Sequence, residues 1–73
     1  MHTIARSAEL TARELQVIEL LADGRSAREI AAQLEISRAT ARTHVTNIYR
    51  KLDVNNRVEA TRWYLSAYPN GLS

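Results

Sequence analysis

The chain has 73 residues, enough for one domain near the smallest size at which a hydrophobic core holds without cross-links. Hydrophobic residues make up 45% of it, mostly Leu, Ile, Val and Ala, which favours a packed helical fold, while the lack of cysteine excludes disulfides and thiolate metal sites. The net charge of +2 indicates little by itself, so its distribution over the predicted elements matters more.

The first predicted helix begins after Thr11 and ends near Gly24. Thr11 and Glu14 have the spacing of a capping box, in which the threonine oxygen accepts a backbone N–H of the helix and the glutamate reaches back to the cap. Apolar residues then recur at helical spacing, and the glycine supplies the left-handed conformation that commonly ends a helix.

Two further helices are predicted after short breaks. Ser26 and Glu29 repeat the capping box and open a helix of about two turns, and Ser37 opens a longer helix that runs to about Leu52. The apolar residues of the longer helix share one face at spacings of four, three and four: Ala41, Val45, Ile48 and Leu52. This order of a short helix, a tight break and a longer basic helix is the layout of a helix-turn-helix, although an ordinary helical hairpin has the same spacing.

The fourth predicted helix begins near Asn56, again with an acid three residues later, and runs to about Ala67. The chain is therefore expected to be all-α, with four helices in one domain over residues 10–68. We expect residues 1–9 to be an arm or the stub of a linker and residues 69–73 to be a tail.

Positive charge is concentrated on the third predicted helix. Between Ser37 and Leu52 there are four positive side chains and no negative one, whereas residues 1–36 hold six acids against four arginines. A one-sided basic segment is expected where a protein binds a polyanion, and a solvated basic face is the alternative.

Several other classes of protein are excluded by what the sequence lacks. No carboxylate pair, nucleophile–base pair or phosphate-binding loop can be identified, and His2 and His44 stand far apart, so we expect neither an enzyme nor a metal or other cofactor. No apolar run is long enough to cross a membrane or to form the core of a signal peptide. We therefore expect a cytoplasmic protein with no membrane partner.

The stretch from Leu10 to Ala60 resembles the LuxR-type DNA-binding domain, also called GerE- or NarL-like, of bacterial transcription regulators. The matching residues stand in register over most of the chain: Leu10, Thr11, Arg13, Glu14, Glu29, Ile30, Ala31, Ile36, Ser37, Thr40, His44, Val45, Asn47, Ile48, Lys51, Leu52, Val54, Arg57 and Ala60. The resemblance implies a four-helix LuxR-type helix-turn-helix domain whose third helix enters the major groove of double-stranded DNA. It also implies a sequence-specific transcription regulator that dimerises through its fourth helix.

The resemblance assigns roles to side chains of the third helix. Arg42 and Thr43 match positions that touch base edges, and Thr46, one turn further along, is a third candidate. Thr40 and Lys51 match positions that touch phosphate. An arginine suits base reading because it can donate two hydrogen bonds to guanine O6 and N7.

Three further side chains complete the expected interface. Arg38 and Arg50 would hold the register through phosphate contacts, and Asn47 would make either a local contact or a phosphate contact. For the arginines and for Thr46 the alternative is a solvated surface position. Glu35 departs from the family pattern, because it stands in the turn where glycine is common, and we expect it in a left-handed conformation.

On the fourth helix, Val58, Arg62 and Leu65 fall on one stripe, and the resemblance places the dimer contact on this helix. A stripe that merely covers the core is the alternative, while Trp63 and Tyr64 are expected to complete the core or its rim. We expect a homodimer that is weak without DNA and is juxtaposed by two adjacent half-sites.

Two questions about the class of function remain open in the sequence. The same fold could dock a protein partner through its fourth helix instead of reading DNA. With the domain expected to begin at Leu10, the chain is either the effector half of a regulator that also has an N-terminal receiver or sensing domain, or a stand-alone small regulator.

Overall fold

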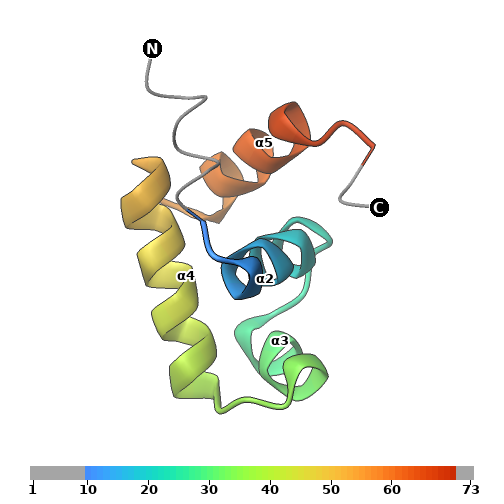
Figure 1. Cartoon of the computed structure of the whole chain (residues 1–73), viewed down its shortest axis with the longest axis vertical. Helices are drawn as coiled ribbons and strands as arrows, with labels where there is room; N and C mark the ends of the chain where they lie inside the picture. The colour runs from blue at the N-terminus through green and yellow to red at the C-terminus, as the bar shows by residue number, and fades with distance from the viewer. Residues whose placement is uncertain (1–9, 71–73) are drawn as a thin grey trace.

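The computed structural model describes residues 10–70, which form four α-helices and no strand (Figure 1). The helices are α2 (Ala12–Ala22), α3 (Ala27–Leu34), α4 (Arg38–Leu52) and α5 (Arg57–Ala67). The predicted all-α, four-helix architecture is confirmed. The predicted arm at residues 1–9 lies outside the described residues, and none of the described helices is long and apolar enough to span a membrane.

Both α2 and α3 begin with a complete capping box. The backbone N–H of Glu14 donates to Thr11 Oγ1 at 3.0 Å, and the N–H of Thr11 donates to Glu14 Oε1 at 2.9 Å. Ser26 and Glu29 repeat this arrangement at the start of α3, with distances of 3.1 and 2.9 Å. The predicted starts are confirmed, and each box satisfies two backbone N–H groups that would otherwise lack a partner.

Single side-chain caps open α4 and α5. Ser37 Oγ accepts the N–H of Thr40 at 3.0 Å, and Asn56 Oδ1 accepts the N–H of Glu59 at 3.0 Å. The carboxylate of Glu59 reaches one residue further back than in a capping box and accepts the N–H of Asn55 at 2.7 Å. The predicted start near Asn56 is therefore confirmed, with a different second hydrogen bond.

A residue in left-handed conformation follows each of the first three helices. Gly24 has a φ of 89°, Glu35 a φ of 59° and Asp53 a φ of 58°. The next residue donates its N–H to a carbonyl five residues earlier at 3.0 Å in the pairs Arg25–Leu20, Ile36–Ala31 and Val54–Tyr49. The expectations for Gly24 and Glu35 are confirmed. Because this conformation brings Cβ close to the backbone, Glu35 is a position of local strain.

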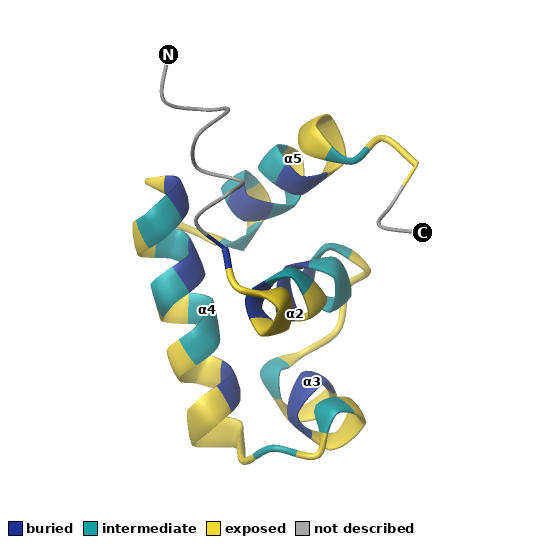
Figure 2. Cartoon of the chain, in the orientation of Figure 1, coloured by how far each residue is buried: buried dark blue, intermediate teal, exposed yellow. Residues whose placement is uncertain are grey.

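The core lies around α2, which packs against α5 on one side and α3 on the other, while α4 runs along all three helices (Figure 1). The largest fully buried side chains are Val17, Ile18, Ile30 and Ile48. Figure 2 shows that the buried residues lie on the faces that the helices turn toward one another. Tyr64 is buried and Trp63 is half-buried, which agrees with the expectation that these aromatics complete the core and its rim.

Candidate nucleic-acid interface

The helices α3 and α4 form a tight corner that leaves the outer side of α4 uncovered. They pack against each other and are joined by residues 35–37, with Ile36 half-buried in the turn. Each helix contributes a buried alanine, Ala31 and Ala41, whose small side chain allows close packing. This corner is the predicted helix-turn-helix, and Figure 2 shows the exposed surface of α4 beside it.

Most of the predicted DNA-contacting residues lie on the uncovered side of α4. The exposed ones are Arg38, Thr40, Arg42, Thr43, Thr46 and Arg50. Asn47 and Lys51 are half-buried. Because α4 contains no acidic residue, nothing within the helix offsets its positive side chains.

The polar side chains on the uncovered side of α4 differ in whether they form hydrogen bonds or ion pairs within the protein. In the described part of the chain, the side chains of Arg38 and Arg42 form no hydrogen bond or ion pair. Thr43 Oγ1 donates to the backbone oxygen of Ala39 at 3.0 Å, and Thr40 Oγ1 accepts from the cap residue's Oγ at 2.9 Å. The methyl group and the oxygen lone pairs of Thr43 are thus the groups it can offer to a ligand.

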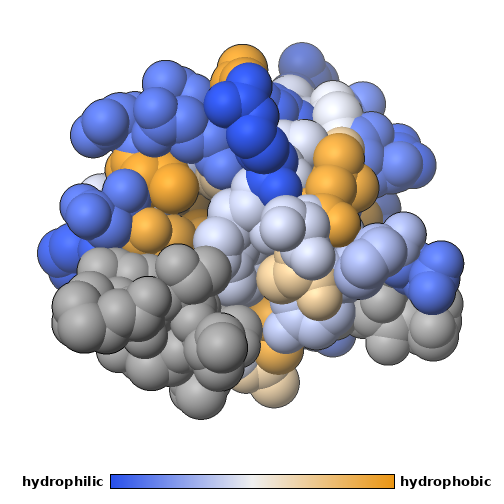
Figure 3. Space-filling view, turned by 90° about the horizontal axis from the view of Figure 1, so that it is seen from above, coloured by the Kyte–Doolittle hydropathy of each residue, from blue (hydrophilic) through white to orange (hydrophobic). Residues whose placement is uncertain are grey.

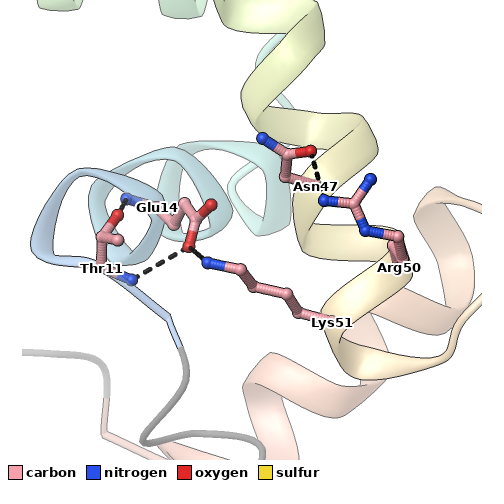
Figure 4. A network of polar contacts seen from close by, with 5 residues as sticks. All are labelled: Thr11, Glu14, Asn47, Arg50 and Lys51. Atoms are coloured by element: carbon pink, nitrogen blue, oxygen red, sulfur yellow. Dashed lines mark hydrogen bonds and ion pairs between the residues drawn. The ribbon is translucent and has the colours of Figure 1, made fainter.

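A side-chain pair orients one of the arginines along the helix. Arg50 Nη2 donates to Asn47 Oδ1 at 2.9 Å, one turn away (Figure 4). This is the local contact, one of the two roles expected for Asn47. It restricts the directions that the Arg50 guanidinium can take, while a phosphate contact by either residue remains a prediction.

Lys51 has an internal partner that the sequence did not predict. Its Nζ lies 2.8 Å from Glu14 Oε1, and the two side chains are 29% and 5% exposed (Figure 4). The same oxygen accepts the N–H of Thr11, so the pair ties the last turn of α4 to the start of α2. Burial raises the pKa of Glu14, but the hydrogen bonds from Lys51 and Thr11 and the Lys51 charge outweigh it and hold that pKa below its usual value of 4.5.

Arg57, at the start of α5, joins three parts of the fold. Its Nη2 donates to the backbone oxygen of Leu21 at 2.9 Å and also to the backbone oxygen of Arg25. These two carbonyls belong to the last turn of α2 and to the loop before α3. In the sequence Arg57 is only one of many residues that match the family pattern, and no local spacing reveals a contact with a residue 36 positions away.

The predicted dimer stripe lies at the surface of α5. Val58 is 63% exposed and Leu65 is 56% exposed, and Arg62 between them is exposed as well. These side chains border a groove of about 470 Å³ between α2 and α5. From the α5 end of the molecule, Figure 3 shows apolar surface between hydrophilic side chains. Val58 and Leu65 thus expose more than half of their surface, and the dimer contact expected here stays a prediction.

The family model of the bacterial regulatory proteins of the luxR family, GerE, matches residues 8–64. The chain belongs to the luxR family of bacterial regulatory proteins. This match confirms the resemblance seen in the sequence, the helix-turn-helix fold class and the predicted class of function, a domain of transcription regulators.

Several named relatives of this chain are longer than it is. The chain is 49% identical to the transcriptional regulatory protein DesR of Bacillus subtilis (strain 168) over 51 residues, which are 70% of this chain and 26% of DesR. It is 48% identical to the nitrate/nitrite response regulator protein NarP of Escherichia coli (strain K12) over 56 residues, 77% of this chain and 26% of NarP. The HTH-type transcriptional regulator MalT of Vibrio cholerae serotype O1 is 41% identical over 59 residues, 81% of this chain and 6% of MalT. The chain thus spans about a quarter of two relatives and a small part of the third.

Proposed function

We propose that this luxR-family domain binds double-stranded DNA by placing α4 in the major groove. The observation that carries the proposal is the outer face of α4, where arginine and threonine side chains are exposed and no acid interrupts them. A helix of 15 residues is about 22 Å long and, with its side chains, about 10–12 Å across, which matches a groove about 12 Å wide. Behind it, α3 supports α4 in the manner of a helix-turn-helix.

The side chains of this face divide into base readers and phosphate contacts. We assign Arg42 to base reading because its exposed guanidinium can donate two parallel hydrogen bonds to guanine. Thr43 and Thr46 share the exposed side of the helix and can offer a methyl group to thymine or an oxygen to a base edge. Arg38 and Arg50 hold the register through phosphates, which adds affinity without sequence information.

The remaining candidates contribute at the edges of this face. Thr40 lies in the first turn of α4, where the partial positive charge of the helix N-terminus favours a phosphate. Asn47 adds a phosphate contact next to Arg50. For Lys51 we propose a supporting role, because its ammonium is already paired with the buried carboxylate of Glu14. This replaces the phosphate contact expected from the sequence.

We propose that α5 forms the contact between two copies of the domain on DNA. Val58 and Leu65 supply exposed apolar surface on one stripe, and a symmetric pairing of that stripe would match two half-sites of a palindromic sequence. The stripe is small, so the dimer is weak without DNA. Since the matched relatives are several times longer than this domain, we further propose that it is the DNA-reading part of a regulator whose signal is sensed by another domain.

The division between base reader and phosphate contact is tested by comparing Arg42→Ala with Arg50→Ala. Binding is measured by fluorescence anisotropy, at several salt concentrations, to a duplex selected by the wild type and to an unrelated duplex. Arg42→Ala should reduce the preference for the selected duplex by about 5- to 150-fold. Arg50→Ala should weaken both duplexes alike and lower the salt slope by about 1.

Two outcomes would contradict the proposed function. If Arg42→Ala also weakens both duplexes alike, the arginine contacts the backbone and α4 does not read bases through it. If the wild type binds neither duplex at low salt, the domain is a protein-interaction module. The exposed Val58 and Leu65 on α5 would then be the place to map its partner.

A further inference from the structure

The side chain of Arg57 holds the junction between α2 and α3. Its Nη2 donates to the backbone oxygen of Leu21 at 2.9 Å and to that of Arg25, four residues further along. Ser26, which follows, is the N-cap of α3. A single half-buried arginine of α5 therefore contacts both the last turn of α2 and the residue that precedes the N-cap of α3, the supporting helix of the helix-turn-helix.

The junction already has its own backbone hydrogen bonds, which do not involve α5. The N–H of Gly24 donates to the oxygen of Leu21 at 3.1 Å, and the N–H of Arg25 donates to the oxygen of Leu20 at 3.0 Å. These bonds close the end of α2 but do not tie it to any other helix. Arg57 adds that tie, and a planar guanidinium is suited to it because its donors have a fixed geometry.

The same side chain borders the recognition helix. A groove of about 370 Å³ is lined by Arg57, by Ala27 at the start of α3, and by Arg42, Thr46 and other residues of α4. Arg57 thus lies where α5, the start of α3 and the base-reading side of α4 meet. A shift of the α2–α3 junction would change the shape of this groove and with it the position of Arg42 relative to α3.

We propose that Arg57 is a positioning residue for DNA recognition. It does not contact DNA; it fixes the start of α3 against α4 and links α5 to the base-reading face. The inference rests on the proposed function, because it assigns Arg57 to the same DNA-reading surface. It follows that a change in the packing of α5 reaches Arg42 through this side chain.

The test compares Arg57→Met and Arg57→Lys with Arg13→Met, a matched change at an exposed arginine of α2 that has no role in the proposed DNA or dimer contacts. Without DNA, amide hydrogen exchange of Gly24 and Arg25 reports whether the junction has loosened. With DNA, anisotropy on a single half-site removes any effect of α5 on dimer formation. Circular dichroism at each temperature gives the folded fraction, so that affinities are compared per folded molecule.

Arg57→Met should raise the exchange of Gly24 and Arg25 and lower the preference for the selected half-site by about 2- to 30-fold, with the salt slope unchanged. Arg57→Lys keeps the charge but not the planar fork, so it should restore part of both properties. Arg13→Met should leave both at the wild-type level. A contact that only stabilised the fold would lower the affinity for selected and unrelated duplexes equally and leave the preference unchanged.

Three results would overturn the proposal. A salt slope lowered by about 0.9 in Arg57→Met would make Arg57 itself a phosphate contact. Unchanged exchange at Gly24 and Arg25 would show that Arg57 does not hold the junction. An unchanged preference would remove the link to recognition. Failure of the wild type to bind any duplex would instead contradict the proposed function, while the exchange measurement, made without DNA, still tests the junction.

Discussion

Replacing Lys51 by Met tests whether this lysine supports the fold or contacts DNA. The change removes the ammonium 2.8 Å from Glu14 and leaves a carboxylate whose side chain is only 5% exposed. Breaking a fully buried ion pair costs about 3–5 kcal/mol, and leaving a buried acceptor without its partner costs about 1–3 kcal/mol. Because the Lys51 side chain is 29% exposed and water can reach part of the site, we expect a loss of about 2 kcal/mol in the free energy of unfolding.

The loss should appear as a fall of about 8–16 °C in the melting temperature of this small domain, measured by circular dichroism together with urea denaturation. The double variant Lys51→Met/Glu14→Gln should recover part of the loss, since it removes the uncompensated charge. Arg50→Met is the matched control on the exposed face and should change stability by less than about 0.5 kcal/mol. In DNA binding, Lys51→Met should leave the salt slope unchanged per folded molecule. A normal melting temperature combined with a slope lowered by about 0.9 would refute the supporting role and make Lys51 a phosphate contact.

Three further predictions follow from the helix ends, from the buried carboxylate and from α5. Glu35→Gly should stabilise the fold by about 0.5–1 kcal/mol, because it relieves a left-handed glutamate at φ 59° but adds freedom to the unfolded chain. Asp53→Gly should stabilise it less, since aspartate tolerates this conformation better. Equal gains of the two variants in urea denaturation would contradict the argument. The folded-state pKa of Glu14 lies below 4.5, so the contribution of its carboxylate to the free energy of unfolding is complete above pH 4.5 and is lost as the pH falls through the folded pKa. The stability difference between wild type and Glu14→Gln should therefore shrink only below pH 4.5. A difference that shrinks between pH 7 and 5 would disprove this. Val58→Asp should leave the melting temperature and the affinity for a single half-site unchanged but should weaken binding to a double site. Undiminished binding to the double site would exclude α5 as the dimer contact.

The helix starts were predictable because capping is a local interaction. Ser26 and Glu29 lie three residues apart, so each can satisfy a backbone N–H of the other without help from the rest of the fold. The outward position of Arg42 and Arg50 was equally predictable, because the helical period places them away from the apolar face of α4. The left-handed Glu35 followed from its place in a turn where the family commonly has glycine.

Contacts between helices were beyond the reach of local spacing. The pair of Glu14 and Lys51 joins residues 37 positions apart, and the contact of Arg57 with Leu21 joins residues 36 positions apart. Periodicity indicates which face of a helix is apolar, but the partner of a polar side chain at the edge of that face depends on how two helices cross. For this reason the internal partner of Lys51 and the contacts of Arg57 could not be predicted, while the phosphate contact that the resemblance implies for Lys51 stays untested.

Selection of DNA from a pool of randomised duplexes tests the central claim most directly, that α4 reads bases in the major groove. The wild-type domain is bound to the pool over a series of salt concentrations, and the bound fraction is sequenced after repeated rounds. The account predicts binding that falls steeply with salt and enriches a two-fold symmetric motif, with the preference lost in Arg42→Ala. Salt-sensitive binding that enriches no sequence, or an enriched motif that Arg42→Ala selects equally well, would contradict it.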